Sequence, residues 1–117
     1  SRDVRVPVEP HEIPKDFARA LEEFEQSLSP DVTPAWLARR SKLSSQRLAR
    51  LTKRLFNLTP NQFITKSRIA AASRALRNTD QSVAEIAHAC GFYDHSAFTR
   101  AFRSATGTTP SEFRAQQ

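Results

Sequence analysis

The sequence predicts an all-α protein of seven helices. Three observations predict it: the 117 residues include only two glycines, helix-capping residues recur along the chain, and apolar residues recur at helical spacing. Strand patterns are weak, because Val4, Val6 and Val8 alternate only at the N-terminus, where Pro7 and Pro10 indicate an extended tail.

Each helix has its own start signal. The first is expected over about residues 14–28, where Phe17, Leu21, Phe24 and Leu28 lie at helical spacing before Pro30. The six later helices each begin after a capping residue: Thr33 before Pro34, Ser44, Thr59 before Pro60, Ser82, Asp94, and Thr109 before Pro110. The helices that follow Ser44, Thr59 and Asp94 are expected to end near residues 55, 77 and 105.

Part of the chain repeats. Leu37 and Ala38 match Ile86 and Ala87 at an offset of 49 residues, and past one inserted residue the offset becomes 50. The pairs at that offset include Leu48 with Phe98, Arg50 with Arg100, Leu51 with Ala101, Thr59-Pro60 with Thr109-Pro110, and Phe63 with Phe113. Each copy reads as a short helix, a tight turn and a longer helix, which is a helix-turn-helix unit.

The repeat predicts two helix-turn-helix units joined by a linker helix. We expect an extended tail or interdomain linker over residues 1–12, and the first helix with the first unit over 13–58. The linker helix is expected over 59–78, and the second unit with a C-terminal helix over 79–117.

Basic residues dominate the chain after residue 30. Residues 1–30 contain four basic and seven acidic side chains, whereas residues 31–117 contain 14 basic and five acidic ones. Between Asp31 and Asp80 there are 11 basic residues and no acidic residue. This one-sided run favours a nucleic-acid partner, with an anionic membrane second, over a basic face that only confers solubility.

The longer helix of each unit has a polar face opposite its apolar face. In the second unit, Phe98, Ala101, Phe102 and Ala105 are spaced to face the core. The opposite faces carry Ser96, Thr99, Arg100 and Arg103 in the second unit, and Gln46, Ala49, Arg50 and Lys53 in the first. Arginine pairs with guanine and glutamine with adenine in the major groove. An ordinary solvated face is the alternative for either helix alone, but the same face occurs twice in a basic chain.

Three segments of the second half form a dense pattern: Ile86-Ala87-His88-Ala89-Cys90-Gly91-Phe92, Ser96-Ala97-Phe98-Thr99-Arg100-Ala101-Phe102 and Gly107-Thr108-Thr109-Pro110-Ser111-Glu112-Phe113-Arg114. This pattern closely resembles the signature of AraC/XylS-type transcription regulators, and the resemblance covers about residues 14–114. It implies a DNA-binding domain of a bacterial transcription regulator, with two helix-turn-helix units bridged by a linker helix. The recognition helices would begin near Ser44 and Asp94.

The resemblance also implies which side chains contact bases. These positions are Ser45, Gln46 and Arg50 in the first unit, and His95, Ser96 and Arg100 in the second. The first unit departs from the pattern, because Lys42 and Asn57 replace the usual glycines and Thr52 replaces a large aromatic residue. Because Thr52 is smaller than the usual aromatic residue, we expect less core beneath the first recognition helix.

Two units on one chain can enter successive major grooves on one face of a duplex, about one helical turn or 34 Å apart. Other basic or polar side chains are then expected to contact phosphates, which set affinity and position. These candidates are Arg39, Arg40, Lys42, Arg47, Lys53, Arg54, Lys66, Arg68, Thr99 and Arg103.

No cofactor or metal is expected. His88 and Cys90 lie two residues apart on a helix and so point about 200° apart, which prevents them from binding one metal together. Cys90 is expected to be a core residue, and as the single cysteine it cannot form an internal disulfide. A cytoplasmic location is expected for this reason and because no apolar run is long enough to span a membrane.

The chain does not begin with methionine, so we expect it to be a fragment of a longer protein. The family resemblance implies a ligand-binding or dimerisation domain N-terminal to Ser1, and a contact with RNA polymerase is a further expectation. No catalytic arrangement is recognisable, and the chain itself is not expected to be an enzyme. Two alternatives stay open: a DNA-binding fragment of a bifunctional DNA-repair enzyme and regulator, and a helical adaptor for protein partners.

Overall fold

The computed structural model describes residues 13–117, and these residues form seven α-helices and no strand. The helices are α1 (Lys15–Ser27), α2 (Pro34–Ser41), α3 (Ser45–Phe56), α4 (Pro60–Asn78), α5 (Val83–Ala89), α6 (His95–Thr106) and α7 (Pro110–Ala115). The predicted all-α class is confirmed. The tail expected over residues 1–12 lies outside the described residues. Within 13–117, no helix combines the length and the apolar character needed to cross a membrane.

The predicted capping residues begin the helices. Three of them act alone, each accepting a hydrogen bond from the backbone N–H three residues later over 2.7–3.1 Å: Thr33, Ser44 and Asp94. Three others form reciprocal capping boxes: Thr59 with Gln62, Ser82 with Glu85, and Thr109 with Glu112. In the last box, hydrogen bonds with the backbone and then the side chain of Thr109 hold the pKa of Glu112 below its ordinary value.

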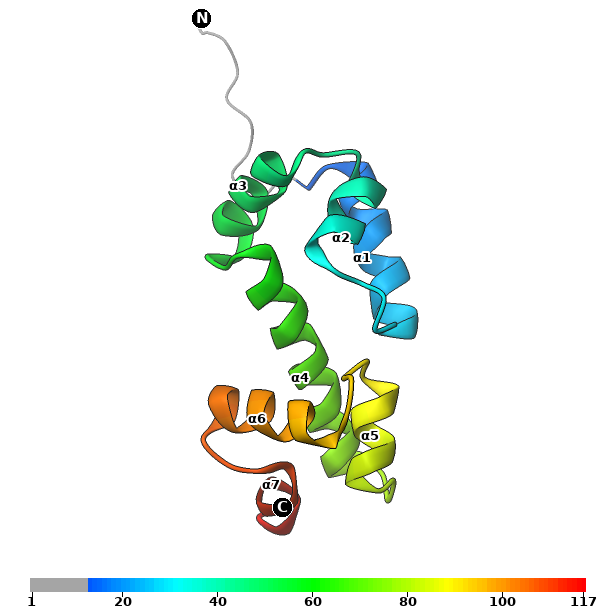
Figure 1. The fold of residues 1–117 in the computed structure, drawn as a ribbon, viewed down its shortest axis with the longest axis vertical. Coiled ribbons are helices and arrows are strands. Elements are labelled where there is room, and N and C mark those ends of the chain that lie inside the picture. Colours follow the sequence, from blue (N-terminus) through cyan, green and yellow to red (C-terminus); the bar gives the residue numbers. More distant parts are fainter. Residues whose placement is uncertain (1–12) are drawn as a thin grey trace, which may run out of the picture.

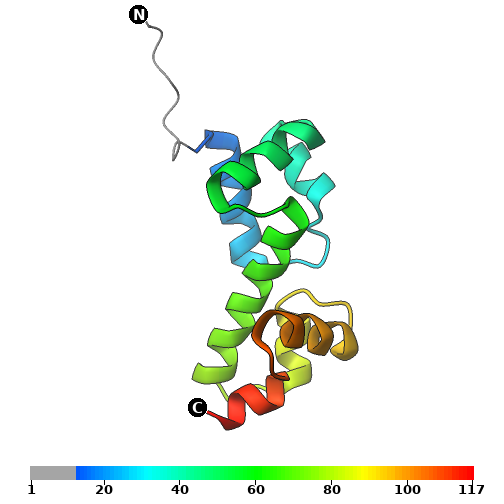
Figure 2. The same cartoon turned by 90° about the vertical axis from the view of Figure 1, so that its left-hand side faces the viewer.

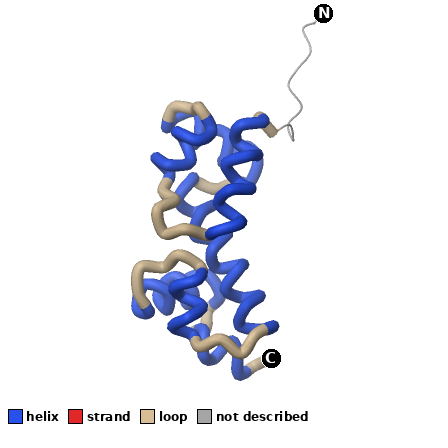
Figure 3. Tube along the Cα trace, turned by 90° about the vertical axis from the view of Figure 1, so that its right-hand side faces the viewer, coloured by secondary structure: helices blue, strands red, loops and turns tan. Residues whose placement is uncertain are grey.

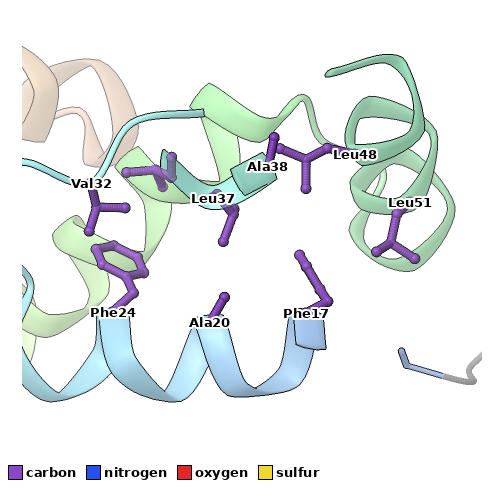
Figure 4. Close-up of a cluster of buried hydrophobic side chains, with 9 residues drawn as sticks. Phe17, Ala20, Phe24, Val32, Leu37, Ala38, Leu48 and Leu51 are labelled. Carbon is purple, nitrogen blue, oxygen red and sulfur yellow. The ribbon is translucent and has the colours of Figure 1, made fainter. Parts of the chain in front are cut away.

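Two hydrophobic cores lie at opposite ends of the long helix α4 (Figure 1). The first core combines α1, α2 and α3 with Ile64 at the N-terminal end of α4. Figure 4 shows Phe17, Ala20 and Phe24 of α1 pointing toward the side chains of α2 and α3. The second core combines α5, α6 and α7 with the C-terminal half of α4. We call α2 with α3 the first unit and α5 with α6 the second unit.

The turns of the two units have the same backbone conformation despite their different residues. Gly91 and Gly107 both have a φ of 85° in the second unit. The matching positions of the first unit, Lys42 and Asn57, have φ values of 59° and 61°. Left-handed conformation is unfavourable for side chains with a Cβ and is best tolerated by glycine and then asparagine. The first unit therefore keeps the turn geometry that the repeat predicts, at some conformational cost.

One expected core residue is exposed. Ala105 was predicted to face the core with Phe98 and Phe102, which are both 0% exposed. Residues 103–106 are all exposed, so the last turn of α6 extends past the second core. Helical spacing correctly identified the inward face, but it could not show where the core ends along the helix.

Candidate nucleic-acid interface

The longer helices of the two units lie on the same side of the molecule. Figure 1 shows α3 and α6 both to the left, at opposite ends of α4, with α1, α2 and α5 to the right. In Figure 2, where that left-hand side faces the viewer, α3 crosses in front of α1 and α6 lies in front of α5. A single ligand surface can therefore reach both helices without passing around the molecule.

α3 presents a polar face opposite a packed one. Leu48, Leu51 and Thr52 are buried, at 1%, 6% and 0% exposure. All three residues predicted to contact bases are exposed: Gln46 and Arg50 lie on the opposite face, and Ser45 is the first residue of the helix. The amphipathic pattern thus fixes the rotation of the helix about its axis, and this rotation directs the polar side chains to solvent.

α6 repeats this arrangement with aromatic packing beneath it. Phe98 and Phe102 are fully buried, with ring centroids 5.7 Å apart. The three predicted base-contact residues, His95, Ser96 and Arg100, are all exposed, and Ser96 and Arg100 lie on the face opposite the two rings. Two of these side chains, on His95 and Ser96, belong to the first turn of the helix. Side chains near the N-terminus of a recognition helix are those that reach base edges in a major groove.

Most of the predicted phosphate-contact residues are exposed. This group contains Arg39, Arg47, Lys53, Arg54, Lys66 and Arg103, and Thr99 is partly exposed. Arg47, Arg50 and Arg54 line one hollow of about 300 Å³ beside α3, together with Pro14, Leu43 and Leu51. Three guanidinium-bearing side chains around one hollow make this a strongly positive part of the surface.

Two predicted phosphate contacts already have acidic partners on α1. Arg40 donates hydrogen bonds to both carboxylate oxygens of Glu23 over 2.7 and 2.8 Å, and its guanidinium lies 5.0 Å from the centre of the Trp36 ring. The Lys42 ammonium lies 3.9 Å from an Asp16 carboxylate oxygen. These partners reduce the positive charge that Arg40 and Lys42 offer to a phosphate.

The prediction for Arg68 was wrong. Its side chain was expected to contact phosphate, but the residue is only 6% exposed. The guanidinium donates hydrogen bonds to the backbone carbonyls of Leu28, Ser29, Val32 and Cys90. Burial lowers the pKa of this guanidinium from its ordinary value. The local sequence around Arg68 suggested a solvated side chain. The carbonyl groups that bury it come from distant segments, so the local sequence could not show this burial.

Tyr93, which was not among the predicted site residues, is 93% exposed and lies immediately before the Asp94 cap of α6. Its neighbour Phe92 packs against the second core. The sequence contained one signal for this residue: Tyr93 is an aromatic residue in a turn, between the core residue Phe92 and the helix cap Asp94. The ring extends the exposed surface at the N-terminal end of α6.

Cys90 is a core residue, as predicted, with 4% exposure. Burial raises the pKa of its thiol, which favours the neutral form. Within the described part of the chain, no three His, Cys, Asp or Glu side chains are placed to hold a metal ion. The exposed polar faces of α3 and α6 carry hydrogen-bond donors and positively charged side chains.

Comparison with known proteins finds a family with the same design. The family model of a helix-turn-helix domain matches residues 37–116. The transcriptional activator RhaR of Mannheimia succiniciproducens is 35% identical over 91 residues, which cover 78% of this chain and 33% of RhaR. The transcriptional regulator CdhR of Pseudomonas aeruginosa is 33% identical over 101 residues, covering 86% of this chain and 30% of CdhR. The chain thus spans about a third of the length of these relatives.

Solved structures show the same fold. The DNA-binding domain of the global transcriptional factor AdpA, determined in complex with a target DNA, has a TM-score of 0.80 and 29% identity, covering 86% of this chain and 91% of that domain. A transcriptional regulator from Chromobacterium violaceum, described as containing an AraC-type DNA-binding domain, has a TM-score of 0.76 and 26% identity, covering 87% of this chain and 91% of that one.

Proposed function

Because the chain belongs to the AraC-type family of helix-turn-helix DNA-binding domains, we propose that it binds a specific site on double-stranded DNA as part of a bacterial transcription regulator. The observation that carries this proposal is the duplicated polar face of α3 and α6, two helices that lie on the same side of the molecule (Figures 1 and 2). The AdpA domain, which was solved with its target DNA, supports it.

The two recognition helices would enter successive major grooves on one face of the duplex. α4 joins the units and contains 19 residues, a length of about 28 Å at 1.5 Å per residue. Successive major grooves on one face are about 34 Å apart. If the distance between α3 and α6 differs from the distance between successive major grooves of straight DNA, the duplex would bend to match it. Bending the duplex would cost about 1–6 kcal/mol.

The exposed residues divide into two roles. Base edges would be read by Ser45, Gln46 and Arg50 from α3 and by His95, Ser96 and Arg100 from α6. Phosphates would be contacted by Arg39, Arg47, Lys53, Arg54, Lys66, Thr99 and Arg103. Arg68 has no part in the interface because it is buried. The exposed ring of Tyr93 is suited to an apolar contact beside the second half-site, for example with a thymine methyl group.

The longer relatives support a larger architecture for the whole protein. They are about three times the length of the segment they share with this chain. In this proposal, a ligand-binding or dimerisation domain precedes the segment, and the complete regulator acts in the cytoplasm and contacts RNA polymerase. The division of the chain into the four segments given above is part of the same proposal.

Selection from a random duplex library, followed by binding titrations at several salt concentrations, tests the function. We expect a two-part motif with half-sites about ten base pairs apart. We also expect an affinity that falls with salt at a slope of about −0.9 for each phosphate neutralised. A library without enrichment, combined with weak binding that salt does not change, would contradict the proposal and favour a protein-binding adaptor.

A further inference from the structure

A buried arginine connects the two halves of the molecule. Arg68 lies in the middle of α4 and is 6% exposed. One terminal nitrogen, Nη1, donates to the carbonyl oxygens of Leu28 at 2.6 Å and Cys90 at 3.0 Å. The other, Nη2, donates to those of Ser29 at 2.9 Å and Val32 at 3.1 Å. We call Arg68 and these four carbonyl groups the Arg68 joint.

The four carbonyl groups come from opposite halves of the chain. Residues 28, 29 and 32 lie in the segment between α1 and α2, beside the first core. Cys90 is the C-cap of α5 and begins the turn of the second unit. Figure 3 shows these two loops meeting at the middle of the molecule, and the Leu28 side chain packs against both cores. Arg68 therefore ties the first half to the turn of the second unit.

Gly91 makes this close approach possible. It has a φ of 85°, which favours glycine. A Cβ at this position would overlap the Arg68 guanidinium and the carbonyl oxygen of Leu28. The matching residue of the first unit, Lys42, has a similar backbone conformation but no equivalent arginine joint among the described hydrogen bonds. The glycine of the second unit thus serves the joint as well as the turn.

The chemistry of the joint resists relative movement of the two halves. A buried guanidinium loses its hydration and needs hydrogen-bond acceptors in its place. Here the acceptors are backbone carbonyls, and the Phe24 ring lies 5.1 Å from the guanidinium carbon. If the segment after α1 moved away from the second unit, the buried charge would lose acceptors on one side. Separation of the halves is therefore opposed by the desolvation of a charge as well as by apolar contact.

We propose that Arg68 is a positioning residue that fixes the first unit relative to the second, and so sets the half-site spacing that the protein accepts on DNA. The part of this inference that concerns half-site spacing rests on the proposed function. Its structural part, a fixed relation between the two units, is measurable without DNA. The two parts can therefore succeed or fail separately.

Arg114 provides a matched control. It also donates to three backbone carbonyls, those of Leu76 at 3.1 Å, Thr79 at 3.1 Å and Gln81 at 2.6 Å. All three belong to the end of α4 and the loop before α5, on the side of the second core. Loss of Arg114 should lower stability without loosening the first unit from the second.

The first measurement is the distance between the two halves in the absence of DNA. Spin labels on Gln26→Cys in α1 and Ala84→Cys in α5, both exposed positions, are introduced into a Cys90→Ala background. We expect a narrow distance distribution in the parent and in Arg114→Met. We expect a clearly broader distance distribution in Arg68→Met and in Arg68→Lys. Methionine has no hydrogen-bond donor, and the compact ammonium group of lysine cannot bond all four carbonyls as the planar guanidinium does.

The second measurement uses DNA sites in which two base pairs are inserted between the half-sites. The parent chain and Arg114→Met should prefer the original spacing. In Arg68→Met and Arg68→Lys this preference should fall by about tenfold, which corresponds to the loss of one strong hydrogen-bonding interaction. If the parent chain binds no DNA site, the proposed function is contradicted. The distance measurement would still test the Arg68 joint in that case.

The inference is overturned if folded Arg68→Met or Arg68→Lys keeps both the narrow distance distribution and the spacing preference of the parent. It is also overturned if both variants lose their far-ultraviolet helical signal, because Arg68 would then support global stability instead of relative position. A distance distribution in Arg114→Met as broad as that of the Arg68 variants would likewise contradict it.

Discussion

In the second unit, three phenylalanine rings in series, Phe92, Phe98 and Phe102, lie with centroids 4.9 and 5.7 Å apart, and Phe113 continues the series at 5.3 Å. The first unit has Leu43, Leu48 and Thr52 at the positions that match the first three of these rings. The fully buried aromatic side chains of the first core, Phe17 and Phe24, come instead from α1 (Figure 4). The comparison shows that the repeated backbone needs a filled core, and that a neighbouring helix can supply the missing volume.

The two units also differ in polar detail. Ser41, the match of Cys90, is 3% exposed, and its hydroxyl has no hydrogen-bond partner in the described structure. Lys42 and Asn57 hold left-handed conformations that the second unit gives to glycine. The first unit therefore carries small energetic costs at its turns that the second unit avoids. On the outer faces the order reverses, since α3 contains four basic residues and α6 two, apart from His95.

The largest expected difference concerns the cores. Phe102→Ala should lower the free energy of unfolding by about 3–5 kcal/mol, because it leaves a cavity among packed rings. Thr52→Ala at the matching position should lower the free energy of unfolding by about 1 kcal/mol, because it removes one methyl group and one hydrogen bond. In that hydrogen bond the Thr52 hydroxyl donates to the Ala49 carbonyl over 3.3 Å. Urea denaturation measures both values. Equal losses of stability would contradict the prediction, because they would mean that Thr52 contributes as much to the packing of its core as Phe102 does.

The next effect concerns base recognition. Arg50→Ala and Arg100→Ala should each weaken DNA binding by about 1–3 kcal/mol and relax specificity at one base position. The positions affected should lie in different half-sites, because the two arginines belong to different units. Titrations against a set of single-base variants of the selected site measure this. A loss of equal size on every variant would identify the side chain as a phosphate contact instead.

A smaller effect is expected at the turns. Lys42→Gly should stabilise the protein by about 1 kcal/mol, since glycine relieves the left-handed strain. The ion pair with Asp16 that it removes is exposed and contributes little. The converse change, Gly107→Ala, should destabilise by a similar amount, because no atom lies within 4 Å of the new Cβ and strain is the main cost. Thermal denaturation compares both with the parent; a loss of stability in Lys42→Gly would show that the ion pair outweighs the strain.

The smallest expected effect concerns phosphate contacts. Lys53→Ala on α3 and Arg103→Ala on α6 should each reduce the salt slope of DNA binding by about one unit and weaken binding to all sequences alike. Arg19→Ala is the control, because Arg19 lies on the acidic helix α1 and should leave the slope unchanged. A slope that stays the same in Lys53→Ala would remove this residue from the interface.

Local features of the fold were predictable from the sequence. Caps such as Ser44 and Asp94 act on residues only three positions away, so a short stretch of sequence contains the whole interaction. The outward faces of α3 and α6 followed from helical periodicity for the same reason. The base-contact and phosphate-contact roles stay predictions, since exposure alone shows only that these side chains can reach a ligand.

Long-range features were not predictable in the same way. Arg68 is buried by carbonyls that lie up to 40 residues away in the sequence, so its environment depends on tertiary structure. Ala105 fits the helical period, but it lies past the end of the second core. Lys42 and Asn57 were recognised as departures from the family pattern, and the structure shows that both nevertheless adopt the left-handed conformation.

We propose that α3 and α6 contact one DNA duplex from the same side. Methylation protection combined with hydroxyl-radical footprinting on a selected site tests it most directly. We expect two protected major-groove patches about ten base pairs apart on one face of the duplex. A single protected patch, or two patches on opposite faces, would contradict it.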